Sequence, residues 1–255
     1  MVLSTQNTTL ATTPRKRDAP ILVPLIAFDH RCVQPAAELT GSSITLRSHH
    51  IIARRSAKMT SGPTTVAAIA GEAEVDHAIA TLVLAFGSDP IARWIYHDPH
   101  QYLLHIPRLF QALGSSSFEA GGAQRTSDGL GVALWLPPGV RGDDGPIEAV
   151  ITESIAGEKQ ADVGAVFERT EHYRPTEPHW YLSLIGVEAL NRNKGAGATL
   201  LQHGLRQCDR EHRPAYLWSS NPLNTSLYKR HGFEILSTIQ VGSSPPIIPM
   251  LRHAR

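Results

Sequence analysis

A basic, glycine-containing segment, residues 192–197 (RNKGAG), is the first place in this sequence where residue types and spacing predict chemistry. The apolar run at residues 181–187 predicts a buried strand before it, and helical periodicity follows it. A helix that begins at such a turn presents free backbone N–H groups at its positive end. The segment therefore predicts a site for a pyrophosphate, bound largely by the backbone.

A phenol near the end of a predicted short helix could supply an acid beside this site. Tyr228 stands about thirty residues after the glycine segment and five before Phe233. Its ordinary pKa of about 10 keeps it protonated at neutral pH, so it can donate a proton. Asn224, one helical turn earlier, could cap the helix or bind a ligand.

The glycine spacing excludes two common phosphate loops. A dinucleotide-binding loop needs a third glycine where this chain has Leu200, and a P-loop needs its lysine after the glycines, whereas Lys194 precedes them. The residues fit the pattern Arg/Gln-x-x-Gly-x-Gly/Ala through Arg192, Gly195 and Gly197. In this they resemble the GNAT superfamily of acyl-CoA-dependent N-acetyltransferases.

Within that superfamily, the chain resembles the puromycin N-acetyltransferase branch. The similarity rests on residues 174–182, on residues 132–139 and on an asparagine four positions before Tyr228. It extends from about Thr65 to Arg252 and is weakest over residues 141–171.

The resemblance implies an α/β GNAT fold over residues 64–255, with a mixed central sheet flanked by helices. It also implies transfer of an acetyl group from acetyl-CoA to the primary amine of a small molecule, by direct attack. No metal, nucleic acid or membrane partner is expected, and the protein would be a cytoplasmic monomer or homodimer.

The resemblance also assigns the cofactor contacts. The strand that ends at residue 187 would separate from its neighbour at a bulge, for which Gly186 is suited, and pair with the pantetheine arm. The N–H of Val187 would face the thioester carbonyl. The expected cofactor-binding residues are Ile185, Gly186, Val187, Arg192, Asn193, Lys194, Gly195, Ala196, Gly197, Ala198 and Asn224.

For catalysis, the resemblance makes Tyr228 the acid that protonates the coenzyme A thiolate. The general base is open: His172 and Glu177 are candidates, His179 lies beside them, and some enzymes of this superfamily use water alone. The helices before residue 113 would form one wall of the acceptor site. Its candidate substrate contacts are Asp89, Trp94, Tyr96 and His97.

Alternation along the strand at residues 179–187 predicts that Trp180, Leu182 and Leu184 share one face. Helices are expected near residues 72–86, 91–96, 102–113 and 195–211, with partly helical structure at 141–173. Further strands are expected within 115–131 and at 131–136, 215–219, 234–241 and 247–252.

Composition separates the first part of the chain from the rest. Residues 1–58 carry eight basic and three acidic residues, whereas residues 59–255 carry sixteen and twenty. The extension at residues 1–63 is interpreted as disordered or as an organellar presequence, and Met59 is an alternative start. Cys208 lies on an apolar helix face and is expected to be a core residue.

Two other functions stay open from the sequence. The acceptor could be a protein or peptide amine, or the chain could be a catalytically idle acyl-CoA-binding module. The acceptor would be set by the helices before residue 113 and by residues 141–173, where the resemblance is thinnest.

Overall fold

The structure is a computed structural model that describes residues 65–69 and 71–255. The predicted extension over residues 1–63 lies outside the described residues. The strands are β1 (Val66–Ala68), β2 (Ala123–Thr126), β3 (Gly131–Leu136), β4 (Trp180–Val187), β5 (Ala215–Ser219), β6 (Glu234–Ile235) and β7 (Ile248–Arg252). The helices are α1 (Glu72–Ala85), α2 (Pro90–Ile95), α3 (Pro99–Glu119), α4 (Asp144–Ser154), α5 (Gly157–Glu171), α6 (Ala196–Arg210) and α7 (Thr225–Arg230), with short 3-10 turns η1 (Ala189–Asn191) and η2 (Pro222–Asn224).

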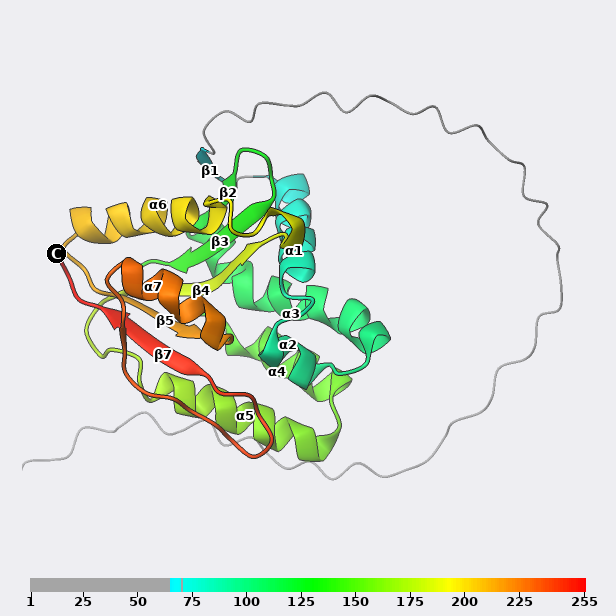
Figure 1. The fold of residues 1–255 in the computed structure, drawn as a ribbon. Helices are drawn as coiled ribbons and strands as arrows, with labels where there is room; N and C mark the ends of the chain where they lie inside the picture. The colour runs from blue at the N-terminus through cyan, green and yellow to red at the C-terminus, as the bar shows by residue number, and fades with distance from the viewer. Residues whose placement is uncertain (1–64, 70) are drawn as a thin grey trace, which may run out of the picture. The chain divides into compact units, whose positions relative to one another are not determined.

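The strands form one sheet in the order β1-β2-β3-β4-β5-β7-β6. Neighbouring strands are antiparallel except β4 and β5, which run parallel. Helices cover both faces (Figure 1). The architecture confirms the predicted α/β class with a mixed central sheet flanked by helices.

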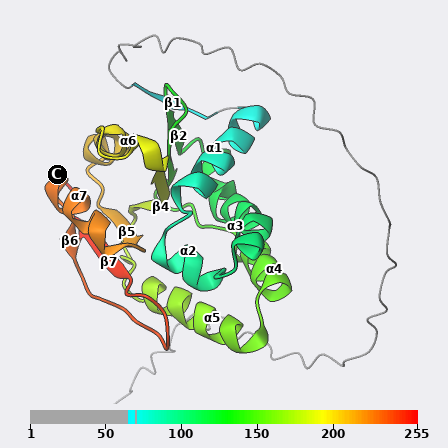
Figure 2. The same ribbon diagram turned by 45° about the vertical axis from the view of Figure 1, so that its right-hand side comes forward.

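Alternation along β3 shows why helices cover both faces. Val132 and Leu134 belong to a core built with α1 and α3, whereas Ala133 and Trp135 belong to a second core built with α6 and α7. All four are fully buried, which requires apolar cover on each side of the strand. Figure 2 shows α6 on one side of the sheet and α1 and α3 on the other.

A β-bulge in β4 overturns the predicted alternation along that strand. Leu134 of β3 pairs with Leu184, but the next residue, Trp135, pairs with Leu182, so Ser183 is the extra residue. The extra residue places Leu182 in the α6 core and Leu184 in the α1 core. The expectation that these two leucines share a face was therefore wrong.

The parallel pair β4–β5 is joined at one end only. Trp180 pairs with Ala215 and Tyr181 with Tyr216, and no pairing between the two strands extends beyond those residues. β5 instead pairs along its whole length with β7. The two strands are therefore separated along the rest of β4, toward Val187.

Three other elements differ from expectation. The helix expected at residues 102–113 runs from Pro99 to Glu119, and it includes Ser115, whose hydroxyl donates to the Ala112 carbonyl of the same helix, and the fully buried Ser117. The strand expected at residues 234–241 shortens to Glu234–Ile235, with an isolated bridge from Ile239 to Ile247. β1 is an edge strand that the sequence pattern missed.

No helix among the described residues is long and apolar enough to cross a membrane.

Candidate functional site

The glycine segment forms a left-handed turn into α6. Asn193 and Gly195 have φ values of 63° and 92°, a conformation that favours glycine and tolerates asparagine. The first helical N–H bond is made by Thr199 to the carbonyl of Gly195. The N–H groups of residues 196–198 thus have no partner within the helix, and no acidic side chain lies in its first turn.

The space around this turn suits a bound anion. A Cβ added at Gly195 would meet no atom within 4 Å. A Cβ at Gly197 would lie 3.8 Å from the side chains of both Leu227 and Val187, so the start of α6, the end of β4 and α7 meet here. The predicted phosphate turn and the predicted oxyanion strand are therefore neighbours in space.

The backbone of Val187 faces the separated side of β4. The adjacent Glu188 donates its N–H to Leu130, which precedes β3, over 2.9 Å. Because successive residues of a strand point their N–H groups to opposite sides, the N–H of Val187 points away from β3 and toward β5. That is the orientation which a donor to a ligand between the strands would need.

Gly186 serves close packing in the structure, and the bulge lies at Ser183 instead. A Cβ at Gly186 would lie 2.7 Å from the Cβ of Ala85 and 3.1 Å from Leu82. The missing side chain lets α1 approach β4 directly. The expectation that Gly186 forms the bulge was therefore wrong, although the strand does separate from β5.

Arg192 reaches α1 in this structure. Its guanidinium donates a hydrogen bond to the carbonyl of Ala85, in the last turn of α1. A cation at a helix C-terminus bonds a free carbonyl and complements the helix dipole. The hydrogen bond ties the turn before α6 to the end of α1, and the predicted contact of Arg192 with the cofactor stays a prediction. Lys194 is exposed and donates to Asn191 over 3.0 Å.

Tyr228 lies buried in the second core, with 5% of its surface exposed and its ring 6.1 Å from that of Phe233. Its hydroxyl has no hydrogen-bond partner among the residues that the structure describes. Burial raises the pKa of Tyr228, and the nearby Asp89 carboxylate raises it further. The phenol therefore stays protonated well above neutral pH and can act only as a proton donor there.

Asp89 joins the site from the loop between α1 and α2. Its Oδ1 accepts the N–H groups of Ile91 and Ala92 at 3.0 and 3.1 Å, which caps α2. Its Oδ2 accepts the hydroxyl of Ser220, just past β5, at 2.6 Å. Burial raises the pKa of the Asp89 carboxyl, although the Ser220 bond, the two backbone bonds and the charge of Arg192 oppose the rise. The sequence indicated Asp89 as a substrate contact but gave no signal for Ser220.

The predicted general bases lie at the other end of β4. Glu177 and His172 are exposed and precede the strand, at the end where β4 and β5 pair. His179 is half-buried, its Nδ1 lies 2.7 Å from the carbonyl of Glu177, and burial lowers its pKa. Since β4 rises by about 3.3 Å per residue, roughly 20 Å separates this end from Val187. The structure therefore places these three residues at the opposite end of β4 from Val187.

Other predicted contacts are placed as follows. Asn224 is exposed at the start of α7 without capping it, and Asn221 caps η2 instead, accepting the Leu223 N–H at 3.0 Å.

The aromatic residues predicted as substrate contacts have partners within the protein. The Trp94 indole N–H donates to the Ser243 hydroxyl at 3.1 Å, and the Lys159 ammonium lies 3.4 Å from the centre of the Trp94 ring. Tyr96 is buried with its hydroxyl 2.7 Å from that of Ser154, and His97 is exposed.

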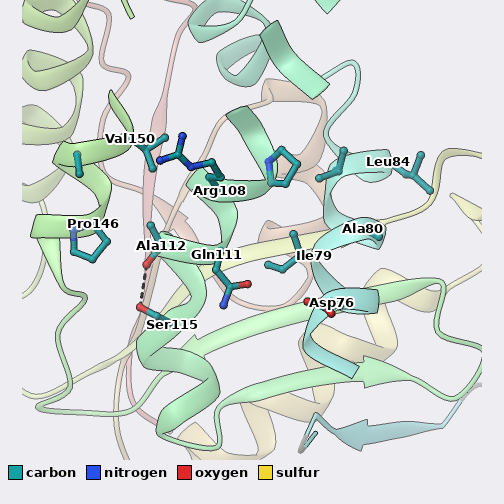
Figure 3. Close-up of a pocket in the computed structure, with 13 residues that line it drawn as sticks. Asp76, Ile79, Ala80, Leu84, Arg108, Gln111, Ala112, Ser115, Pro146 and Val150 are labelled. Atoms are coloured by element: carbon teal, nitrogen blue, oxygen red, sulfur yellow. Dashed lines mark hydrogen bonds between the residues drawn. The ribbon is translucent and has the colours of Figure 1, made fainter. Parts of the chain in front are cut away.

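An open, mainly apolar groove of about 960 Å³ lies elsewhere, between α1, α3 and α4 (Figure 3). Ile79, Leu84, Pro107 and Val150 line it, with Asp76 and Arg108 among the polar residues. None of the predicted site residues reaches this groove. It is therefore separate from the site at the end of β4.

Comparison with known proteins fits this geometry. No protein-family model matches the chain. An uncharacterized N-acetyltransferase of Schizosaccharomyces pombe is 25% identical over 197 residues, which cover 68% of this chain and 76% of the relative.

Two solved structures extend the comparison. A histone acetyltransferase HPA2 and related acetyltransferase from Corynebacterium glutamicum is 26% identical, with a TM-score of 0.56 over 75% of this chain and 97% of its own. Arylalkylamine N-acetyltransferase 2 from Aedes aegypti shares the fold at 13% identity, with a TM-score of 0.54 over 76% and 100% of the two chains. This chain therefore has the GNAT-type N-acetyltransferase fold, and its relatives support an acetyltransferase.

Proposed function

We propose that the protein transfers an acetyl group from acetyl-CoA to the primary amine of a small molecule. The observation that carries the proposal is the separation of β4 from β5 beside the turn into α6. The pantetheine arm would lie along the unpaired edge of β4, and the pyrophosphate would accept the free N–H groups at the turn, where a Cβ at Gly195 would meet only open space.

We assign the following roles in the reaction to groups of this chain. Residues 195–198 bind the pyrophosphate through their backbone, and the N–H of Val187 donates to the thioester oxygen. Tyr228 donates a proton to the departing sulfur, for which its unbonded hydroxyl is available because it is protonated at neutral pH. The amine attacks directly, since Cys208 is fully buried and burial raises its pKa to about 12, so it is not a thiolate nucleophile.

The proposal includes three more specific predictions: the chain belongs to the puromycin N-acetyltransferase-like branch, the protein is cytoplasmic, and its acceptor is a small molecule. An agmatine N-acetyltransferase and the Aedes enzyme share the fold at 13% identity. Their names describe small amines, which supports such an acceptor here. The alternative is a protein acceptor, which the HPA2-related relative favours by its name. Whether the protein is a monomer or a homodimer stays a prediction.

Calorimetric titration with acetyl-CoA tests the proposal. Wild-type protein is expected to bind with micromolar affinity, and Gly195→Trp to show no binding, because the indole fills the space of the pyrophosphate. The matched control is Gly139→Trp, at a glycine with a similar φ of 84° and equally open space, but in the turn after β3. Gly139→Trp is expected to bind as the wild type does.

The titration has two decisive outcomes. If folded wild-type protein did not bind acetyl-CoA, the proposed function would be wrong. If Gly195→Trp bound as well as Gly139→Trp, the cofactor would lie elsewhere. Release of coenzyme A with agmatine, tyramine or puromycin, compared with a peptide that has a free N-terminus, then separates the two acceptor classes.

A further inference from the structure

Asp89 combines a helix cap with a carboxylate oxygen that capping does not use. Oδ1 accepts both backbone bonds of the cap, whereas Oδ2 accepts the Ser220 hydroxyl alone among the described residues. A carboxylate oxygen can accept two hydrogen bonds, so Oδ2 keeps one acceptor position. Cap residues on a surface are usually exposed, but Asp89 has only 8% of its surface exposed.

The surroundings place Asp89 and Ser220 near the end of β4 that carries Val187. Asp89 follows α1, which packs on Gly186 next to Val187, and Ser220 follows β5 on the far side of the separated strands. The carboxylate is close enough to Tyr228 to raise its pKa, and Arg192 is close enough to act on the pKa of Asp89 itself. The predicted acid and this carboxylate thus lie at one site.

We propose that Asp89 is the general base of the acetyl transfer and that Ser220 is the positioning residue which orients its Oδ2. The inference rests on the proposed function and gives the site the base that neither Glu177 nor His172 is placed to supply. As the amine nitrogen bonds to the carbonyl carbon, its proton moves to Oδ2. The carbon–sulfur bond breaks, and the sulfur takes the phenolic proton of Tyr228. Asp89 then releases its proton to water and the Tyr228 phenolate regains one.

The charge environment fixes the expected pH dependence. Arg192 from the turn before α6 faces Asp89, as do the phenols of Tyr102 on α3 and Tyr228 on α7, which are neutral at pH 7. A base works only when deprotonated, so activity falls as pH drops through its pKa. The Ser220 bond favours the charged carboxylate, and its removal raises that pKa further. Ser220→Ala must therefore move the acidic limb of the kcat/KM profile to higher pH.

The test compares pH profiles of coenzyme A release with agmatine, tyramine or puromycin, whichever the wild type acetylates. Asp89→Asn keeps an oxygen for the cap, so it is expected to fold. It should lower kcat/KM by about 10²-fold or more and remove the acidic limb. The matched control is Asp98→Asn, at an exposed aspartate that caps α3 and precedes proline in the same way. It should leave the profile unchanged.

Each result decides the question. Two results together support Asp89 as the general base: the acidic limb of the pH profile disappears in Asp89→Asn, and it moves to higher pH in Ser220→Ala. Calorimetry must also show that both variants bind acetyl-CoA as the wild type does. An acidic limb at the wild-type pH in both variants would overturn the assignment of Asp89. If Asp89→Asn does not fold, the pH profile of Ser220→Ala alone decides the question. Absence of acetyl-CoA binding in the wild type would instead reject the proposed function. If the wild type bound acetyl-CoA but released no coenzyme A with any of the three amines, both the small-amine acceptor and Asp89 as the base would be overturned.

Discussion

Tyr228→Phe is expected to lower kcat for coenzyme A release by about 10²-fold or more while leaving the stability of the protein unchanged. The substitution removes only the hydroxyl and retains the ring that packs against Phe233. Since that hydroxyl has no hydrogen-bond partner among the described residues, its removal breaks no bond within the protein. Steady-state kinetics and thermal unfolding of the same preparation measure both effects.

Tyr216→Phe provides the matched control. Tyr216 is also buried, but its hydroxyl donates to the carbonyl of Thr170 at 2.8 Å, and it lies on β5 at the end that pairs with β4. We expect the control to lose about 1 kcal/mol of stability and to retain its turnover. A Tyr228→Phe enzyme with wild-type kcat would remove Tyr228 from the mechanism.

Gly204→Ala is expected to lower the free energy of unfolding by about 1–3 kcal/mol. A Cβ at this position of α6 would lie 2.4 Å from the ring of Trp135, which is fully buried in β3. Neither partner can move freely, because one belongs to a helix and the other to the central sheet. For a domain of this size, the loss corresponds to a fall of roughly 2–12 °C in the melting temperature.

Gly164→Ala is the matched control, because Gly164 lies inside α5 and an added Cβ there would meet nothing within 4 Å. Alanine favours helix over glycine by about 1 kcal/mol, so this variant should be more stable than the wild type. Opposite shifts for the two substitutions, measured by chemical denaturation, would support the close contact of α6 with β3. A gain in stability for Gly204→Ala would contradict it.

The sequence predicted those parts of the site that are local in the chain. The turn at residues 192–197 and the helix after it depend on glycine conformation and helical periodicity, which neighbouring residues determine. Asn193 indeed adopts a positive φ. The strand before the turn was also predictable, because an apolar run of that length must be buried.

Features that depend on distant residues could not be predicted in this way. The bulge at Ser183 changes the faces of β4, yet it is visible only in the pairing of that strand with β3. The contact between Asp89 and Ser220 joins residues 131 positions apart. In the sequence, Asp89 before a proline indicates a helix cap, which it is, and carries no sign of its second hydrogen bond. The sequence therefore indicates base candidates only near the strand, at His172 and Glu177.

The pairing of β4 with β5 at one end only also affects how the two parts of the sheet could move. β1 to β4 and β5 to β7 form two half-sheets that are paired only at Trp180 and Tyr181, which gives the joint the geometry of a hinge. Rotation about a hinge moves its far end most, so a small change of angle alters the width at Val187 much more than at Trp180. The hydrogen bond from Ser220 to Asp89 joins the segment after β5 to the loop after α1 near that far end, and it would limit such a change of width.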